Sequence, residues 1–454
     1  MTTASGKATE TPPEQERRRL RAGKPVQIGL LGCGTVGGGV LRLLGDNARY
    51  LGERVGVPLQ VKRVLVRDLE KDRVPECDRA WLTTRADDVI DDPEIDLVVE
   101  VMGGEELALS LVERTLRQGK AVVTANKLLL ATHGPRLLDL AVAARVDLAF
   151  EGAVGGGIPV IRTLREAFAS DWVQSLTGIL NGTCNYVLTR MREDKVGLAE
   201  AIKEAQAKGY AEADPSLDVD GHDAAHKLVV LAMLAFGARV DHAAVPVEGI
   251  RGIDEADHRY AERFGYLIKH LAIGRDLGES IELRVHPALI PQKSVLANVS
   301  GVLNAVLLEG RALGPCLLSG RGAGDLPTAV SVVADILDVA RSIVAGVGGL
   351  QTRGIAMTPR PLRPLADVEA RYYARFGVAD QPGVMARLAG ALGDVGVSIE
   401  QIVQQGLPDE KGGPVEVVMI THRAREGAIQ KALADIGREA FMLRPARVIR
   451  IEDV

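Results

Sequence analysis

The sequence predicts an α/β protein of three parts: a parallel sheet wrapped by helices, an α+β domain, and a small C-terminal βαββαβ domain. Three observations support this fold class. Short β-rich runs alternate with longer helical runs from residue 25 to 150, which is typical of a parallel sheet between helices. A glycine-rich turn follows the first of these runs. A Pro- and Gly-rich stretch near residue 350 separates the last part of the chain from the rest.

Length and charge set the broad class of protein. The 454 residues, 46% hydrophobic and 25% charged, supply enough apolar material for about three domains. The net charge of −5 argues against nucleic acid or an anionic membrane as partners, because binding to either requires a basic excess. No run reaches the ~18 uninterrupted apolar residues of a membrane-spanning helix. We therefore expect small molecules as partners.

Cysteine usage and the N-terminus indicate the compartment. The four cysteines are far apart and form no CxxC pair, which suits a reducing cytoplasm. Residues 1–24 are polar, contain two prolines, and are predicted to be a disordered tail. The arginines at 17–19 and 21 resemble the start of a secretion signal. The six glycines between Gly29 and Gly39 disfavour that alternative.

The first domain is predicted to cover residues 25–150, with a return segment at 320–345. Its expected strands are Val26–Leu31, Leu59–Val66, Leu97–Val101, Ala121–Thr124 and Asp147–Phe150. The second domain, predicted at 151–319, has mixed elements and is expected to bind the substrate and hold the catalytic residues. Its expected elements are a long apolar helix after Gly221 and strands at Gln174–Leu180 and Ile281–Val285.

The last part of the chain follows a predicted linker at residues 346–370, where glycines and prolines disfavour both helix and strand. Residues 371–454 then follow the order strand, helix, strand, strand, helix, strand, which is a ferredoxin-like unit. The expected elements are Tyr372–Val378, Val384–Val395, Ser398–Gln404, Val415–His422, Glu426–Glu439 and Ala446–Ile451.

The turn after the first strand has the pattern GxGxxG. It consists of Gly32, Cys33, Gly34, Thr35, Val36 and Gly37. The first glycine permits a tight turn, the second lets a pyrophosphate approach the backbone, and the third lets the helix pack on the strand. The helix N-terminus stabilises negative charge. We therefore predict a Rossmann-like dinucleotide-binding domain, with a plain packing turn as the alternative.

The end of the second strand bears on the choice of dinucleotide. Arg67 is placed to contact the 2′-phosphate of NADP, whereas Asp68 is placed to accept a hydrogen bond from the ribose hydroxyl of NAD. A solvated charge pair is the alternative for both residues. The pattern favours NADP, with NAD also usable.

A cluster of acidic residues precedes the long apolar helix, with five carboxylates in the twelve residues from 212 to 223. Asp223 and Lys227 are four residues apart, share a helix face, and border the interior. Burial makes charge expensive unless it is paired or used, which favours function over a surface ion pair. A calcium loop is disfavoured because Ser216 and Lys227 would occupy its first and last ligand positions.

Several motifs together resemble the homoserine dehydrogenase family, in family order and over residues 25–345. They are Gly-x-Gly-Thr-Val-Gly at 32–37, Glu100-Val101-Met102-Gly103-Gly104, Thr124-Ala125-Asn126-Lys127, Glu151 through Pro159, Asn181-Gly182-Thr183 with Tyr186, the whole of 209–227, and Gly322-Ala323-Gly324-Asp325-Leu326-Pro327-Thr328-Ala329. The resemblance implies NAD(P)-dependent interconversion of L-homoserine and L-aspartate 4-semialdehyde in threonine, methionine and isoleucine biosynthesis. A catalytically inactive amino-acid sensor is the alternative. The presence of Lys127, Glu212, Asp223 and Lys227 together disfavours the inactive sensor.

The resemblance assigns roles to five residues. Lys227 resembles the family's acid/base lysine, which Asp223 is placed to orient, and Lys127 is similar to the lysine between cofactor and substrate. Cations suit this chemistry, because oxidation of a hydroxyl releases a proton and reduction of an aldehyde requires one. Glu212 resembles the residue that holds the substrate ammonium. Asp218 resembles a second carboxylate facing the substrate.

The resemblance also implies a border residue and a cation site. Thr183 would border the substrate; the alternative is a turn in which the Thr183 hydroxyl only makes a local hydrogen bond. Gly324 would approach the cofactor. A monovalent cation, Na⁺, is implied at a site built mainly from backbone carbonyls, for which a tight turn is the alternative. Its residues are Glu151, Val154, Gly156 and Ile158.

Residues 371–454 resemble an ACT domain, through Ala379–Met385 and Val397–Ile399. Asp380 and the free amides of the following helix suit the charged ends of an amino acid. The resemblance implies feedback control, with threonine as the first candidate effector and dimerisation alone as the alternative. It also implies a homodimer or homotetramer. We expect a chain truncated after about Ala345 to keep a competent catalytic core.

Overall fold

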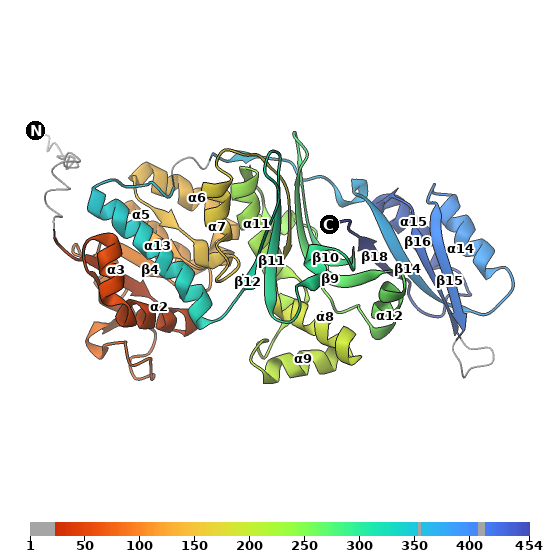
Figure 1. The fold of residues 1–454 in the computed structure, drawn as a ribbon, viewed down its shortest axis with the longest axis horizontal. Helices are drawn as coiled ribbons and strands as arrows, with labels where there is room; N and C mark the ends of the chain where they lie inside the picture. The colour runs from red at the N-terminus through yellow and green to blue at the C-terminus, as the bar shows by residue number, and fades with distance from the viewer. Residues whose placement is uncertain (1–22, 353–355, 407–413) are drawn as a thin grey trace, which may run out of the picture. The chain divides into compact units, whose positions relative to one another are not determined.

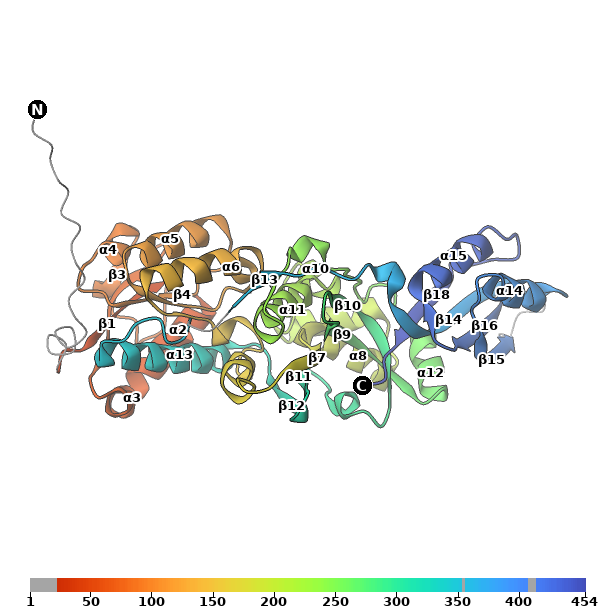
Figure 2. The same cartoon turned by 90° about the horizontal axis from the view of Figure 1, so that it is seen from above.

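The computed structural model describes residues 23–352, 356–406 and 414–454. The predicted tail, residues 1–24, lies outside the described residues except for its last two. The chain divides into two compact units (Figures 1 and 2). One holds the chain up to Pro159 together with Ala323–Ala356, and the other holds Val160–Gly322 with Met357–Val454. Within the described ranges, no helix is long and apolar enough to cross a membrane.

The first unit is built on a six-stranded parallel sheet with the order β3-β2-β1-β4-β5-β6. Its strands are β1 (Val26–Leu31), β2 (Leu59–Leu65), β3 (Leu82–Thr83), β4 (Leu97–Glu100), β5 (Ala121–Thr124) and β6 (Leu148–Ala149). Strands β4 and β5 are buried along their whole length, as expected where helices cover both faces. The predicted parallel α/β sheet is confirmed. The two-residue strand β3 was not predicted.

The strand order places the turn after β1 where the order reverses, which is the usual ligand site of such sheets. The helices of this unit are α2 (Thr35–Asp46), α3 (Ala48–Val55), α4 (Asp87–Ile90), α5 (Glu106–Arg117), α6 (Lys127–Ala144) and α13 (Asp325–Ala345), with short turns η1 (Arg79–Trp81) and η2 (Glu151–Ala153). Helix α13 runs along α2 in Figure 1. Val332 and Ile336 of α13 share one hydrophobic core with Ile28 of β1 and Val40 of α2. A segment remote in sequence therefore completes the core of the dinucleotide domain.

The second unit holds a ten-stranded sheet that begins β12-β11-β7-β9-β10. These strands are β7 (Val173–Ile179), β9 (Tyr266–Asp276), β10 (Ile281–Pro291), β11 (Leu303–Gly310) and β12 (Gly314–Arg321). The helical segments are α7 (Val160–Arg162), η3 (Thr163–Ala167), α8 (Gly182–Asp194), α9 (Leu198–Ala207), α10 (Ser216–Val219), α11 (His222–Ala235), η4 (His242–Ala244), α12 (Glu255–Arg263) and η5 (Val295–Asn298). Helix α11 is the predicted apolar helix, and all of its residues from Asp223 to Met233 are buried.

The C-terminal part of this unit continues the sheet in the order β18-β14-β16-β15. Its elements are η6 (Leu365–Asp367), β14 (Glu369–Ala379), α14 (Val384–Gly393), β15 (Ile399–Gly406), β16 (Pro414–Thr421), β17 (Ala424–Arg425), α15 (Glu426–Ile436) and β18 (Arg447–Ile451). Tyr372 and Phe376 of β14 pack with Leu388 of α14 and Ile429 of α15 in a hydrophobic core. The predicted βαββαβ order is confirmed.

The structure joins this C-terminal part to the second domain more tightly than the sequence indicated. Strand β18 pairs in parallel with β10, with Leu289 opposite Ile451. Tyr373, whose side chain lies on the opposite face of β14 from Tyr372, packs in a core with Tyr260 of α12. Buried Arg284 of β10 donates a hydrogen bond to Glu452 at 2.6 Å. The C-terminal sheet is therefore covered on both faces.

The predicted linker also contacts the second domain. Residues Thr358–Pro359 form strand β13, which pairs with β8 (Ala238–Arg239). The linker prediction assumed that glycines and prolines exclude a strand, but β13 lies at an edge, where a proline needs no partner for its missing N–H. Arg360 donates a hydrogen bond to Asp276 at 2.6 Å. Residues 353–355 of the predicted linker lie outside the described residues.

Candidate active site

The glycine-rich turn links β1 to α2, and two of its glycines cannot be replaced without displacing backbone. Gly32 has φ +99°, and a Cβ there would lie 2.9 Å from the Cα of Met102. A Cβ on Gly37 would lie 2.4 Å from the carbonyl oxygen of Gly32. At Gly34 a Cβ would meet nothing within 4 Å, so this side of the turn is open. The turn is tight on the inside and accessible on the side where a pyrophosphate approaches the helix N-terminus.

A cleft of about 790 Å³ opens at this turn, between the ends of β2 and β4. Arg67 and Asp68 line it, as do Lys71 and Arg73. Arg67 and Lys71 are exposed, whereas Arg73 is half-buried and donates a hydrogen bond to the Cys33 carbonyl at 3.1 Å. Three basic side chains therefore border one end of the cleft, and the cleft suits an anionic dinucleotide.

The segment after β4, from Val101 to Glu105, also lines the cleft, and it follows directly on Glu100. Glu100 is completely buried and accepts hydrogen bonds from the Thr124 hydroxyl at 2.6 Å and the Met102 amide at 2.9 Å. Burial raises the pKa of the Glu100 carboxyl. Asn126 caps α6 by accepting from the Leu129 amide. Lys127 is the first residue of α6, so its position is set by that cap.

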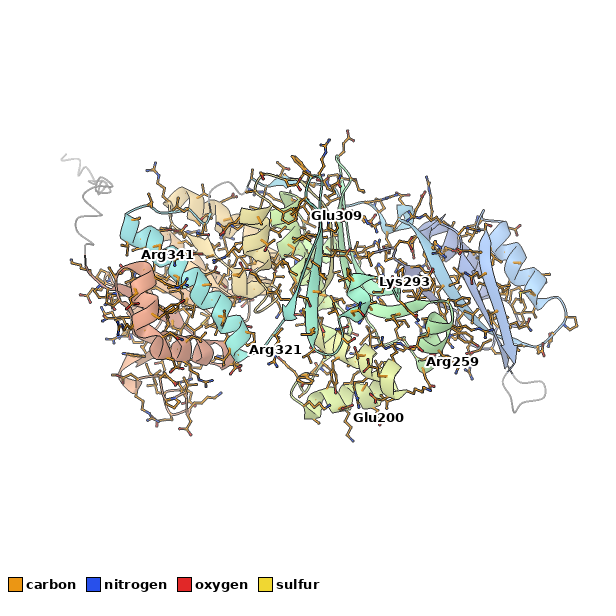
Figure 3. All side chains as sticks on the ribbon, viewed as in Figure 1. Glu200, Arg259, Lys293, Glu309, Arg321 and Arg341 are labelled. Carbon is orange, nitrogen blue, oxygen red and sulfur yellow. The ribbon has the colours of Figure 1, made fainter. Side chains whose placement is uncertain are left out.

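The second unit contains the predicted lysine–carboxylate pair, and the pair is buried. Lys227 and Asp223 are 8% and 4% exposed, which excludes the alternative of a surface ion pair. The Lys227 ammonium donates to Asp223 Oδ2 at 2.7 Å and to the Leu180 carbonyl at 2.8 Å. Helix α11 supplies both side chains, and the end of β7 supplies the carbonyl. Figure 3 shows by contrast Glu200 and Arg259, which lie on the surface.

Asn181 brings a second carboxylate to this pair. Its side-chain amide donates to Asp218 at 2.7 Å and to Asp223 at 2.9 Å. Its side-chain oxygen accepts from the Cys184 amide and so caps α8. Burial and the Asp223 charge raise the pKa of Asp218. One amide thus holds two carboxylates beside the lysine, from segments 37 and 42 residues away.

Two further predicted residues lie near the loop that precedes α10. The Thr183 hydroxyl donates to the Tyr210 carbonyl at 2.7 Å, which ties the start of α8 to this loop. Glu212, two residues further on, is exposed. Its backbone carbonyl accepts from Gln206 at 3.0 Å. The structure therefore leaves the Glu212 carboxylate at the surface, outside the hydrogen-bond network of Lys227.

The predicted cation segment lies in the first unit. Glu151, Val154, Gly156 and Ile158 are all buried. Gly156 has φ +55°, and its carbonyl accepts from the Ser331 hydroxyl at 2.6 Å. Over the described ranges, no group of three or more His, Cys, Asp or Glu residues is placed to hold a metal ion. The predicted cation site is built mainly from backbone carbonyls, which are not among those side-chain groups. Gly324, with φ +124°, precedes α13 in the same unit.

Comparison with known proteins identifies the family. Residues 32–151 match the model of the homoserine dehydrogenase NAD-binding domain, 159–337 match the homoserine dehydrogenase model, and 372–438 match the ACT domain model. The protein belongs to the homoserine dehydrogenase family. It is therefore an oxidoreductase with an NAD-binding domain and a C-terminal ACT domain.

Relatives in this family align along nearly the whole chain. The homoserine dehydrogenase of Pseudomonas aeruginosa is 43% identical over 437 residues, which are 95% of this chain and 100% of the relative. That of Neisseria gonorrhoeae is 41% identical, over 95% and 99% of the two chains. The crystal structure of a homoserine dehydrogenase from Thiobacillus denitrificans superposes with a TM-score of 0.89 at 42% identity, covering 95% and 99%.

A homoserine dehydrogenase from a hyperthermophilic archaeon, solved in complex with NADPH, aligns with a TM-score of 0.59 and 26% identity over 70% of this chain and 98% of that one.

Sequence reasoning missed four residues of the candidate sites described above: Glu100, Asn181, Lys71 and Arg73. Glu100 and Asn181 stand in motifs that carried the family resemblance. A charged run after Asp68 was the available signal for the two basic residues.

Proposed function

We propose that the protein interconverts L-homoserine and L-aspartate 4-semialdehyde, with the buried Lys227–Asp223 pair as its proton-transfer centre. That pair is the observation on which the proposal rests. An ammonium has three donors, and two are directed to Asp223 and the Leu180 carbonyl. The third is available for the oxygen on C4 of the substrate.

Lys227 acts as acid or base according to direction. In semialdehyde reduction it donates a proton to the oxygen that gains negative charge, and in homoserine oxidation it takes the hydroxyl proton. Asp223 orients the ammonium, and Asn181 orients Asp223. A bound nicotinamide dinucleotide supplies the hydride donor or acceptor. We assign Lys127, at the start of α6, as the second cation, between cofactor and substrate as the family resemblance implies.

Carboxylates select the amino-acid end of the substrate. Homoserine and its semialdehyde both carry an α-ammonium, which a carboxylate binds by a charge-assisted hydrogen bond. We assign this role to Glu212, with Asp218 as the second carboxylate facing the substrate. Thr183 supports the position of Glu212, because its hydroxyl bonds to the loop that carries Glu212.

NADP is the preferred dinucleotide in this proposal, and NAD is also used. Arg67 contacts the 2′-phosphate at the basic end of the cleft, where Lys71 and Arg73 add positive charge. Gly32, Cys33, Gly34, Thr35, Val36, Gly37 and Gly324 form the remaining cofactor contacts. The open side of Gly34 supports the pyrophosphate position.

Three further assignments complete the proposal. Na⁺ binds the carbonyls of the buried segment at Glu151, Val154, Gly156 and Ile158, and replacing NaCl by choline chloride at constant ionic strength tests this by lowering activity. The enzyme is a cytoplasmic homodimer or homotetramer. The ACT domain binds an amino-acid effector, with threonine as the first candidate.

The deciding experiment follows NADPH consumption with L-aspartate 4-semialdehyde, then NADH consumption, each with and without threonine. Semialdehyde-dependent oxidation of NADPH is the expected result, faster than with NADH at equal concentration. A folded protein that binds NADPH and oxidises neither cofactor would refute the proposed reaction. It would support the inactive amino-acid sensor instead.

A further inference from the structure

Two cysteines lie side by side at the dinucleotide cleft. The Cys33 and Cys77 sulfurs are 4.0 Å apart, although 44 residues separate them in the chain. Cys33 stands in the glycine-rich turn, lines the cleft, and is half-buried. Cys77 is buried behind it, at 9% exposure. Both are free thiols.

The segment that carries Cys77 is already attached to the glycine-rich turn. Residues 66–78 between β2 and η1 form neither helix nor strand. Arg73, in this segment, donates one hydrogen bond to the Cys33 carbonyl at 3.1 Å and another to the Asp68 carbonyl at 2.5 Å. Cys77 is itself held by a hydrogen bond from its amide to the Val74 carbonyl. The two thiols therefore lie side by side in segments that Arg73 holds together.

We propose that Cys33 and Cys77 form a reversible disulfide bond that closes the dinucleotide site when the enzyme meets a hydroperoxide. The half-buried Cys33 thiol attacks the O–O bond first and becomes a sulfenic acid, and the rest of the hydroperoxide leaves as an alcohol, or as water when the oxidant is hydrogen peroxide. The Cys77 sulfur then displaces the sulfenic oxygen, which leaves as water. Each sulfur loses one electron, and the peroxide gains two.

The environment of the two thiols supports this order. Burial raises the pKa of Cys77 to about 11, so at neutral pH it stays protonated and reacts slowly with an oxidant in solution. It reacts once the sulfenic acid forms beside it. Cys184 is fully buried and donates to the Asp218 carbonyl, and Cys316 lies on β12; among the four cysteines, all of which lie in the described ranges, the sulfur–sulfur contact is that of Cys33 and Cys77.

The new bond would deform the cleft. A disulfide has an S–S length of about 2.05 Å, so the sulfurs must approach by about 2 Å. The glycine-rich turn has little freedom, because Gly32 lies against Met102. The segment 66–78 therefore shifts, and it carries Arg67 and Asp68, which line the same cleft. Oxidation thus moves the groups that contact the dinucleotide.

The test uses the purified full-length protein, with hydrogen peroxide as the oxidant and NADPH as the probe. Peroxide should produce a peptide pair linked through Cys33 and Cys77, seen by mass spectrometry without reduction. NADPH affinity, measured by fluorescence titration, should fall by about tenfold or more. Dithiothreitol should restore both the free thiols and the affinity.

Two variants separate this disulfide from general oxidation. Cys77→Ser removes the second thiol without touching the glycine-rich turn, so it should bind NADPH as the native protein does and should keep that affinity at the peroxide dose that links the native protein. Its linked peptide must be absent. Cys316→Ser is the matched control and should respond as the native protein does. Cys77→Ala replaces Cys77→Ser if the serine destabilises the fold.

Three results would overturn the proposal. One is the absence of the linked peptide in the native protein after peroxide treatment. Another is a linked protein with unchanged NADPH affinity. The last is a Cys77→Ser protein that loses NADPH affinity with the same peroxide dependence as the native one and regains it with dithiothreitol.

Discussion

Replacing Lys227 by methionine tests the centre of the proposed mechanism. The change keeps a long side chain but removes the ammonium, and with it the hydrogen bonds to Asp223 and the Leu180 carbonyl. General acid–base catalysis contributes about 10²–10⁴-fold to a rate, so kcat should fall by that factor. Lys227 acts on the substrate proton and is not among the residues that line the dinucleotide cleft, so NADPH affinity should stay close to native.

The same change should lower stability, and the structure gives the reason. Asp223 is 4% exposed, and the substitution removes the ammonium that pairs with it, while the Asn181 amide still donates to it at 2.9 Å. Breaking a buried ion pair by removing one partner costs about 3–5 kcal/mol. A thermal melt must therefore accompany the kinetics, because a loss of folded protein would imitate a loss of kcat.

The assay is steady-state reduction of NADP⁺ by homoserine, normalised to folded protein and paired with a fluorescence titration of NADPH. Lys203→Met is the matched control, because Lys203 is exposed on α9. It should leave kcat unchanged. A folded Lys227→Met enzyme with kcat within about threefold of native would refute the role of Lys227 in proton transfer.

Three other predictions concern substrate, cofactor and pH. Glu212→Gln should raise the KM for homoserine by about tenfold while kcat changes little, because it removes a partner of the substrate ammonium; unchanged saturation would remove Glu212 from the site. Arg67→Ala should raise the KM for NADP⁺ about tenfold more than that for NAD⁺, since the latter lacks the 2′-phosphate, and equal losses would make Arg67 structural. The pKa of Asp218 is raised by burial and by the charge of Asp223. As the pH is lowered, kcat/KM for homoserine should therefore begin to fall at a higher pH than the pKa of a free aspartate would give. Protonation removes the charge that attracts the ammonium, and Asp218→Asn should flatten that limb of the pH profile.

The local sequence pattern correctly predicted those strands whose burial depends on their own residues. Strands β1 and β5 begin and end where the sequence placed them. Strand β10 was predicted to end at Val285 but continues to Pro291. Its charged residues Glu282 and Arg284 are both 1% exposed, and Arg284 bonds to Glu282 and to Glu452. A partner 168 residues away decides their burial, and no local periodicity records it.

The residues of the candidate site also divide into those that local spacing predicts and those whose role depends on distant partners. Asp223 and Lys227 were predictable because helical spacing alone brings them together. Asn181 was not, since its function depends on carboxylates that approach it only after folding. Glu100 has the sequence appearance of a polar strand end, and its complete burial results from the neighbouring strand β5 and the Thr124 hydroxyl.

The joint between the ACT domain and the rest of the second unit changes what truncation should do. A chain ending at Ala345 would lose β18 and Glu452, leaving buried Arg284 with Glu282 as its described carboxylate partner beside the His286 ring, at a cost of about 3–5 kcal/mol. It would also lose Thr352, which is 1% exposed and donates to the Val146 carbonyl of the first unit. Since whole domains are stable by only about 5–15 kcal/mol, we expect the truncated chain to aggregate or melt far below the native protein, in place of the competent core that the sequence suggested. A soluble core with native kcat and a native-like melting temperature would contradict this.

Regulation is better tested in the full chain with Asp380→Asn, which should reduce inhibition by threonine while catalysis without effector stays unchanged, because the catalytic candidates all precede residue 330.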